Sequence, residues 1–363
     1  MKRRFRVPGL ARASRRAIPL TAVAVLAGVS LAACGGSSDS TASNAADTSS
    51  SGSGKTGTQL ALVAYSTPKK AYDALISAYE QTSQGKGVSF SESFGASGSQ
   101  SRAVASGQPA DVVAFSTAPD VTRLVKAGLV SSGWDAGANQ GVPSNSVVVL
   151  VVRKGNPKHI TGWDDLVKPG VDVVTPNPST SGSARWNILA AYGAELKEGK
   201  TPAEALAYLK TLLTKNVSVQ PSSASSALET FTSGKGDVLL DYESDAIAAE
   251  KAGDSIQYIV PKQTLLIQTP VAITSNGSHK SQAQAFVTWL YSPAAQTIWA
   301  KEGYRPVLQS VASQYASQFP TPPQLFTIKT LGGWTVIDKK FFGASNGLIT
   351  KIEQAAGVPT VSS

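Results

Sequence analysis

Short apolar runs of strand length alternate with amphipathic helical stretches along most of this chain. Residues 60–64 precede a helical stretch at 71–79, and residues 112–115 precede another at 120–127. Strands that alternate with helices in this way form parallel sheets with helices packed on their faces. About 300 residues follow position 58, which is more than one hydrophobic core usually holds. The pattern therefore predicts an α/β fold of two domains, each a mostly parallel sheet flanked by helices.

Two apolar strands mark the places where the chain is expected to cross between these domains. Residues 147–152 are consecutive apolar residues, and residues 271–273 follow Pro270. An unbroken apolar run of this length is typical of a strand that is buried on both faces. We interpret the two strands as hinge crossings. The predicted first domain is discontinuous and covers 59–148 plus 272–363, and the predicted second domain covers 149–271.

The N-terminal region has the pattern of an export signal. Positions 2–16 hold seven Lys and Arg residues and no acidic residue, positions 17–33 are mainly apolar, and Cys34 follows. The apolar run is shorter than the roughly 20 residues that span a bilayer, so an uncleaved membrane helix is the less favoured alternative. Residues 31–34 resemble a bacterial lipobox. We predict a signal peptide over 1–33, lipidation of Cys34 that tethers the chain to the extracytoplasmic face of the cell membrane, and a flexible Gly- and Ser-rich linker over 34–58.

Charge and chemistry-bearing residues exclude several classes of function. Of the 33 basic residues, seven leave with the predicted signal peptide, so 26 face 24 acidic residues and no basic stripe for nucleic acid is retained. Cys34 is the only cysteine, which excludes a disulfide and a cysteine nucleophile in the folded part. The chain has two histidines, far from any acidic cluster, so we expect no metal site and no cofactor. The acidic residues Asp241, Glu243 and Asp245 are interpreted as a strand end or a solvated face.

Three segments rich in small and hydroxyl-bearing residues lie where a strand is expected to give way to a helix. They are residues 94–100, 175–186 and 221–226. Each alone is an ordinary helix cap. Three together predict a set of backbone N–H groups, hydroxyls and helix dipoles that suits a fully ionised tetrahedral anion. A pocket of donors without a carboxylate prefers sulfate to hydrogen phosphate, because the proton of hydrogen phosphate needs an acceptor.

The same segments resemble the sulfate- and thiosulfate-binding proteins of ABC importers, over most of residues 59–334. Residues 175–186 read TPNPSTSGSARW, close to that family's TPNPxTSGGARW. Further matching pieces, in the same order, are residues 152–158, 236–240, 290–293, 304–306 and 326–334. The resemblance implies a two-domain clamshell like a periplasmic binding protein. Such a monomer captures sulfate or thiosulfate in the interdomain cleft and delivers it to an ABC permease.

Ligand contacts follow from the resemblance where the motifs match. It implies that Ser97 donates its hydroxyl, that the segment Ser181-Gly182-Ser183 offers hydroxyl and N–H groups, and that Ala224 offers an N–H. Arg185 is implied to brace the backbone that holds the anion, and a plain structural ion pair is its equally weighted alternative.

Three positions depart from the family pattern. Ser66 stands where the family has an aspartate, Tyr242 stands where it has a tryptophan, and the arginine of its GARGAT turn is missing at Ser225. We include Ser66 and Tyr242 among the candidate ligand residues, because a hydroxyl can donate to an anion. The departures leave molybdate or another oxyanion as an alternative ligand.

Two hypotheses from other functional classes are alternatives to a binding protein. An exported hydrolase or transferase acting on phosphate or sulfate esters would use the same anion site, but it needs a base next to a serine, and neither histidine lies near Ser97, Ser181 or Ser183 in the sequence. A cell-wall adhesion module would have no affinity for small anions. We therefore predict a binding protein and not an enzyme.

Overall fold

The computed structural model describes residues 57–360. The predicted signal peptide, Cys34 and nearly all of the predicted linker lie outside these residues. Within the described part of the chain, no helix has both the length and the hydropathy that crossing a bilayer requires.

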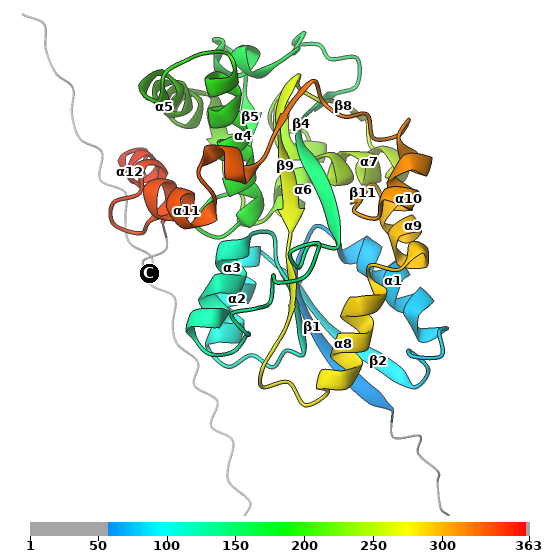
Figure 1. The fold of residues 1–363 in the computed structure, drawn as a ribbon. Helices are drawn as coiled ribbons and strands as arrows, with labels where there is room; N and C mark the ends of the chain where they lie inside the picture. Colours follow the sequence, from blue (N-terminus) through cyan, green and yellow to red (C-terminus); the bar gives the residue numbers. More distant parts are fainter. Residues whose placement is uncertain (1–56, 361–363) are drawn as a thin grey trace, which may run out of the picture. The chain divides into compact units, whose positions relative to one another are not determined.

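The first sheet has four strands in the order β10, β3, β1, β2. Strands β1 and β2 lie side by side in Figure 1. Strand β1 pairs in parallel with both β2 and β3, and β10 is antiparallel to β3. Residues alternate between the two faces of β1, so Leu62 and Val63 belong to different hydrophobic clusters. The strand bounds are β1 (Thr58–Tyr65), β2 (Val88–Gly95), β3 (Val112–Ala114) and β10 (Val271–Ile273).

Five helices cover this sheet, and both faces are therefore buried. One face packs on α1 (Lys69–Glu80), α8 (Lys280–Trp289) and α9 (Pro293–Lys301) through a cluster rich in aromatic rings. The other face packs on α2 (Ser97–Ala105) and α3 (Ala118–Lys126). The two predicted helical stretches at 71–79 and 120–127 are confirmed as α1 and α3.

The second sheet has eight strands and is built around β4 (Ser144–Arg153). Strand β4 is antiparallel to its partners β7, β8, β9 and β11, whereas β5 is parallel to both β6 and β7. Val148 and Val149 contribute to opposite hydrophobic clusters, which explains the unbroken apolar run. The other strands are β5 (Val173–Val174), β6 (Val217–Val219), β7 (Val238–Tyr242), β8 (Ile256–Ile259), β9 (Gln263–Thr269), β11 (Arg305–Pro306) and β12 (Gln324–Phe326).

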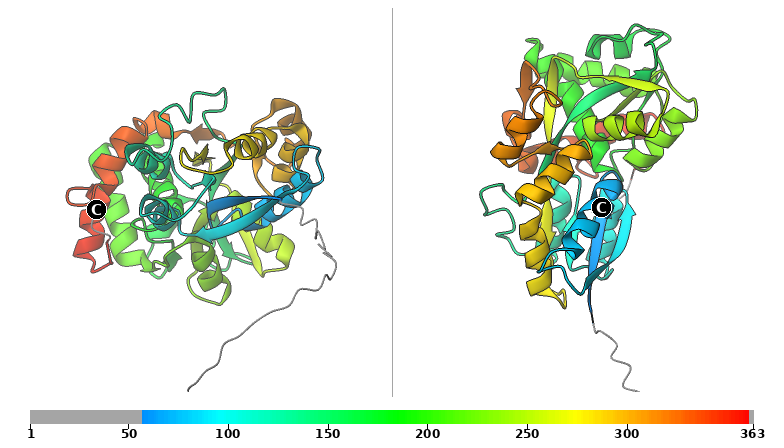
Figure 2. Two further views of the ribbon diagram at one scale, coloured as in Figure 1. Left: turned by 90° about the horizontal axis from the view of Figure 1, so that it is seen from below. Right: turned by 90° about the vertical axis from the view of Figure 1, so that its right-hand side faces the viewer.

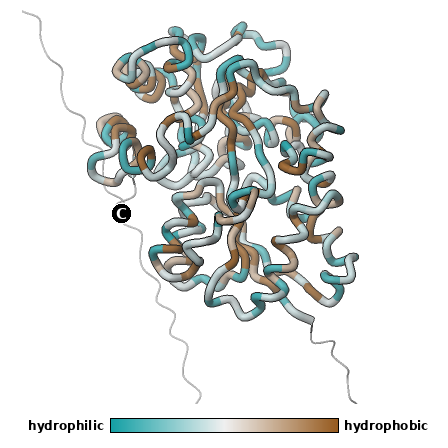
Figure 3. Tube along the Cα trace, viewed as in Figure 1, coloured by the Kyte–Doolittle hydropathy of each residue, from teal (hydrophilic) through white to brown (hydrophobic). Residues whose placement is uncertain are grey.

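Helices cover this sheet as well, and hydrophobic residues gather along the strands of both sheets (Figure 3). The largest cluster joins α4 to the C-terminal helices α11 and α12 on one face, and α6 and α7 pack on the other. The α-helices are α4 (Gly182–Lys197), α5 (Pro202–Thr211), α6 (Ala224–Thr232), α7 (Glu243–Ala252), α10 (Gln309–Ala312), α11 (Trp334–Phe342) and α12 (Leu348–Ala355). Short helical turns are η1 (Trp163–Val167), η2 (Leu212–Asn216), η3 (Ser313–Tyr315) and η4 (Ile328–Leu331).

The chain passes between the two sheets at neighbouring points. The right-hand view of Figure 2 shows the strands of the second sheet above those of the first. The start of β4 pairs with the end of β9, with Ser144 opposite Thr269. Strand β9 continues through Pro270 into β10 of the first sheet, where the Val271 N–H donates to the Gly141 carbonyl at 2.8 Å. A third passage follows α9, because Arg305 pairs with Asn145 of β4.

The predicted domain boundaries remain a prediction. Residues 272–301 belong with the first sheet, as the boundaries propose, and Val271, predicted for the second domain, also pairs with the first sheet. The residues from Arg305 onward instead pair with strands of the second sheet and pack on its largest cluster, through Phe326 and Ile349 among others.

Candidate functional site

The carboxyl ends of the parallel strands in both sheets lead into the segments that the sequence singled out. Strands β1, β2 and β3 end just before Ser66, Ser97 and Ser116 respectively. Strand β6 ends just before residues 220–223, and strand β7 ends at Tyr242. Parallel strands place their carboxyl ends at one edge of a sheet, which is where ligands of α/β proteins bind.

These two edges contact each other, and we call the place where they meet the junction. It consists of residues 65–67, 96–98 and 116–117 of the first sheet's loops, and residues 177–186 and 241–245 of the second. Four hydrogen bonds cross it: Gly98 N–H to the Thr180 carbonyl at 3.0 Å, Trp186 Nε1 to the Ser116 carbonyl at 2.8 Å, Thr67 Oγ1 to Asp245 Oδ2 at 3.1 Å, and Ser116 Oγ with Tyr242 Oη at 2.8 Å.

Helix α4 begins at the junction, with Ser181 at its N-cap and Gly182 as its first residue. Ser181 and Ser183 are both buried. A Cβ atom at Gly182 would lie 2.5 Å from Ser116 Oγ and 2.9 Å from Thr117 Cγ2. Only glycine therefore allows the α4 N-terminus to approach the first sheet this closely, and the predicted helix start at this segment is confirmed.

Helix α6 begins beside α4, at Ala224. Ser223 caps it by accepting from the Ser226 N–H at 3.1 Å. Two bonds tie the loops before the two helices together. The Asn177 N–H donates to the Pro221 carbonyl at 2.8 Å, and Thr180 Oγ1 donates to the Ser222 carbonyl at 2.8 Å. The positive dipole ends of α4 and α6 thus lie in neighbouring loops.

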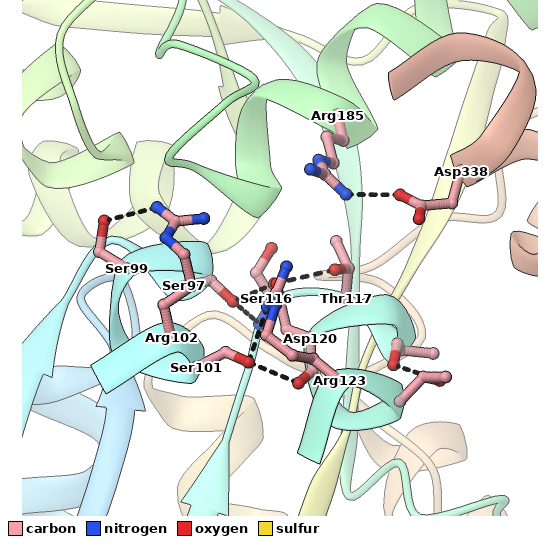
Figure 4. A network of polar contacts seen from close by, with 12 residues as sticks. Ser97, Ser99, Ser101, Arg102, Ser116, Thr117, Asp120, Arg123, Arg185 and Asp338 are labelled. Atoms are coloured by element: carbon pink, nitrogen blue, oxygen red, sulfur yellow. Dashed lines mark hydrogen bonds and ion pairs between the residues drawn. The ribbon is translucent and has the colours of Figure 1, made fainter. Parts of the chain in front are cut away.

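Ser97 is the first residue of α2, and it is buried. Its hydroxyl donates to Asp120 Oδ2 at 2.7 Å and accepts from the Ser116 N–H at 2.9 Å (Figure 4). Asp120 also accepts from Thr117 Oγ1 at 3.0 Å and from Arg123 Nη1 at 2.9 Å. The Ser97 hydroxyl must therefore rotate away from Asp120 before it can donate to an anion.

Tyr242 ends β7 and is fully buried. Burial raises the pKa of its hydroxyl above the ordinary value, while hydrogen bonds with Ser116 and Ser183 lower it. The hydroxyl therefore stays protonated and available as a donor. Its ring centroid lies 6.5 Å from that of Tyr65, the residue before Ser66. Ser66 itself is half-buried in the turn after β1.

The acidic residues 241–245 are buried, so the interpretation as a solvated face is wrong, whereas Asp241 lies at the end of β7, as the strand-end alternative proposed. Glu243 forms a two-pronged ion pair with Arg305, with N···O distances of 2.6 and 2.9 Å. Burial raises the pKa of Asp245 to about 7, although hydrogen bonds with Asp241 and Thr67 lower it. Burial, and then the charge of Asp245, raise the pKa of Asp241 as well. Burial therefore favours the protonated form of both carboxyls.

Arg185 lies one turn into α4 and makes both kinds of contact considered from the sequence. Its Nε donates to the Pro178 carbonyl at 3.0 Å, in the loop that leads to Ser181. Its Nη1 forms an ion pair with Asp338 Oδ1 of α11 at 2.6 Å. The guanidinium also lies over the Phe342 ring, 5.0 Å from its centroid.

Three residues at or next to the junction were missed in the sequence. Ser116 and Thr117 follow the third parallel strand and lead into α3, and Asp120 collects hydrogen bonds from Ser97 and Thr117. The signal was present, because an apolar strand followed by two hydroxyl residues and a helix repeats the pattern of the other segments. As for metal ions, residues 57–360 contain no group of three or more His, Cys, Asp or Glu side chains that could hold one.

Comparison with known proteins decides the family. A family model described as bacterial extracellular solute-binding protein matches residues 60–305, which is more than half of the 363-residue chain. The chain belongs to this family. Its members are binding proteins, which confirms the prediction that the chain is not an enzyme.

Relatives within the family are similar over most of their length. The sulfate-binding protein of Synechococcus elongatus is 40% identical over 343 residues, covering 92% of this chain and 95% of that protein. The thiosulfate-binding protein of Pseudomonas aeruginosa is 34% identical over 282 residues, covering 75% and 85%. The solved structure of the sulfate-binding protein SubI from Mycobacterium tuberculosis H37Rv matches with a TM-score of 0.77 and 46% identity, over 78% of this chain and 99% of that one. The predicted resemblance and the predicted α/β fold of two helix-flanked sheets are confirmed.

Proposed function

We propose that this extracellular solute-binding protein captures sulfate or thiosulfate between its two sheets and delivers the anion to an ABC permease. The observation that carries the proposal is the convergence of strand ends and helix N-termini at the junction. Helices α2 and α4 begin there with Ser97 and Gly182, and α6 begins in the adjoining loop with Ala224. The sulfate- and thiosulfate-binding relatives support the choice of anion.

The candidate donors at the junction suit an anion that carries no proton. The candidate donors are neutral hydroxyl and amide groups, and the N-terminal dipoles of three helices disperse the negative charge. Arg185 is paired with Asp338, so it supports the loop at Pro178 and adds no net charge to the anion site. The proposed ligand residues are Ser66, Ser97, Ser181, Gly182, Ser183, Ala224 and Tyr242.

The two sheets, with their helices, act in this proposal as the two lobes of a clamshell that closes on the anion. The hinge lies where β4 and the β9–β10 connection pass between the sheets. We keep residues 149–270 in the second lobe, since Val271 lies in β10 of the first sheet, and add residues 305–360, which pack on the cluster around α4. The protein acts as a monomer.

A binding panel on the purified full-length chain tests the anion. Sulfate, thiosulfate, molybdate, phosphate and nitrate are titrated by calorimetry, and melting temperatures are recorded in parallel. We expect sulfate or thiosulfate to bind at least tenfold more tightly than phosphate. Tighter binding of molybdate than of sulfate and thiosulfate would replace the proposed ligand. Hydrolysis of sulfate esters without binding of free sulfate would refute the proposal that the protein is a receptor.

The lipid anchor is a separate part of the proposal. Lipidation of Cys34 would hold the receptor near the permease on a linker of about 24 residues, which raises its local concentration there. Cell fractionation of a Cys34→Ala variant tests it, with Ser37→Ala as control. We expect the first variant to leave the membrane fraction and the second to remain. Retention of Cys34→Ala would point to the uncleaved membrane helix.

A further inference from the structure

A cavity of about 420 Å³ lies apart from the proposed ligand residues, on the side of the molecule where α2 and α3 approach α11 and α12. None of the seven proposed ligand residues lines it. Its walls come from both lobes: Arg102 and Arg123 from the first, and Pro178, Arg185, Phe342 and Glu353, among others, from the second.

Three arginines face this cavity, and two of them are neutralised. Arg123 pairs with Asp120 at 2.9 Å, and Arg185 pairs with Asp338 at 2.6 Å. Arg102, in contrast, makes no ion pair with any residue between 57 and 360. Its Nη atoms reach only the Ser179 carbonyl at 3.5 Å and Ser99 Oγ at 3.3 Å (Figure 4). Arg102 is therefore the one arginine of this cavity without a paired carboxylate among the described residues, although Glu353 also lines the cavity.

The environment of Arg102 is unfavourable for an unpaired cation. Burial lowers the pKa of its guanidinium, and the positive charge of Arg123 lowers it further. A negatively charged ligand would relieve both effects. A guanidinium presents a planar fork of donors that matches the two oxygens of a carboxylate.

Part of the cavity lining is apolar. It includes Ile349, which is fully buried, Phe342, which is half-buried, and Pro178 and Ala344. A bare inorganic ion would leave this apolar part unused. The volume lies within the range of about 300–1,000 Å³ that is usual for small organic ligands.

We propose that this cavity is a second binding site, for a small organic acid with a single carboxylate. The carboxylate pairs with Arg102, and the apolar body of the acid packs against Phe342 and Ile349. This site is distinct from the sulfate site and does not depend on the proposed function. Because both lobes contribute walls, an occupied site links Arg102 of α2 to α11 and α12.

Calorimetric titration of the full-length chain with sodium benzoate tests the proposal. Benzamide replaces the charged head by a neutral one, and acetate lacks the apolar body. Each titration is repeated in saturating sulfate, so that the junction cannot accept the probe. We expect benzoate to bind at least tenfold more tightly than benzamide or acetate, with and without sulfate. Equal binding of benzoate and benzamide, or complete competition by sulfate, would overturn the proposal.

Two variants locate the site. Arg102→Gln should weaken benzoate binding at least tenfold, whereas Lys126→Gln, which removes an exposed charge from the neighbouring α3, should not. Phe342→Ala should weaken benzoate binding but not acetate binding. The melting temperature and the sulfate affinity of Arg102→Gln show whether the variant is folded. Unchanged benzoate affinity in a folded Arg102→Gln chain would refute the assignment.

Discussion

At the scale of single residues, the junction is made mostly of neutral groups that are already hydrogen-bonded to one another. Ser97 donates to Asp120, and Ser116 shares a hydrogen bond with Tyr242. An incoming anion must replace these hydrogen bonds with stronger ones. The affinity therefore depends on donors whose existing hydrogen bonds cost little free energy to break. A hydroxyl can turn about its C–O bond, which makes serine and tyrosine suitable donors here.

The clearest test at this scale is Tyr242→Phe. The variant keeps the buried ring and loses the hydroxyl that bonds Ser116. A net hydrogen bond to a charged ligand contributes about 1.5–3 kcal/mol, so we expect the affinity for sulfate to fall about tenfold or more. Calorimetry measures the change.

Tyr208→Phe is the matched control, because this tyrosine donates to the Trp163 carbonyl at 2.6 Å, away from the junction. It should lower stability and leave the affinity unchanged. Equal affinities in wild type and Tyr242→Phe would remove Tyr242 from the site.

At the scale of elements, helix N-termini carry the proposed site, and side chains further along the same helices brace them. Arg185 of α4 connects the Pro178 loop to α11 through Asp338. Helix α12 contributes a different feature, a buried carboxyl. Glu353 has an exposed fraction of only 1% and accepts two hydrogen bonds from Gln220 Nε2, at 3.1 and 3.0 Å.

Two variants distinguish the contact of Arg185 with the Pro178 loop from its ion pair with Asp338. Arg185→Gln removes both the bond to Pro178 and the pair with Asp338, whereas Asp338→Asn removes only the pair. We expect Arg185→Gln to lower the sulfate affinity at least fivefold more than Asp338→Asn does. Calorimetry on both variants decides, and equal losses would mean that Arg185 has only the structural role.

Glu353 makes the stability depend on pH. Burial raises its pKa from 4.5 to about 7, while the bond from Gln220 lowers it. The folded chain therefore holds this proton more tightly than the unfolded chain. The resulting stabilisation is complete below about pH 4.5 and is lost as the pH rises through about 7.

Glu353→Gln removes this titration. The variant should gain stability relative to wild type by about 3 kcal/mol between pH 4 and pH 8, since one pKa unit corresponds to 1.36 kcal/mol. Urea denaturation at the two pH values measures the difference. If the difference in unfolding free energy between variant and wild type is the same at pH 4 and pH 8, Glu353 does not titrate in this range.

At the scale of the whole described chain, the two sheets meet through close backbone contacts as well as side chains. Gly98 bonds to the Thr180 carbonyl, and Gly182 lies against Ser116. Both contacts join residues of different sheets, so they exist only when the sheets are together. Closure thus depends on the absence of a side chain at particular positions.

Gly182→Ala tests this dependence. Its Cβ would lie 2.7 Å from the Ser116 Cβ, which is too close for real atoms. The clash would hold the sheets apart and lower the sulfate affinity at least tenfold, while each sheet keeps its own core. Gly162→Ala is the control, because a Cβ there meets nothing within 4 Å. Calorimetry and melting temperature report on both variants, and wild-type affinity in Gly182→Ala would contradict the proposed closure.

Local patterns in the sequence were enough to predict much of the fold. The apolar runs at 60–64, 112–115 and 147–152 became β1, β3 and β4, and the segment at 181–183 became the start of α4. Strand and helix periodicity and capping act over a few residues, so they are readable without a structure. The motif at 175–186 also led to the family, which comparison confirmed.

The partners of charged side chains were decided only by the tertiary structure. Arg185 pairs with Asp338, 153 positions away, and Arg305 pairs with Glu243, 62 positions away. The burial of residues 241–245 and the lack of a paired carboxylate for Arg102 among the described residues likewise arise from the way the sheets and the C-terminal helices pack. Whether a charge is solvated, paired or left without a partner depends on contacts between distant segments, and no local pattern records those contacts.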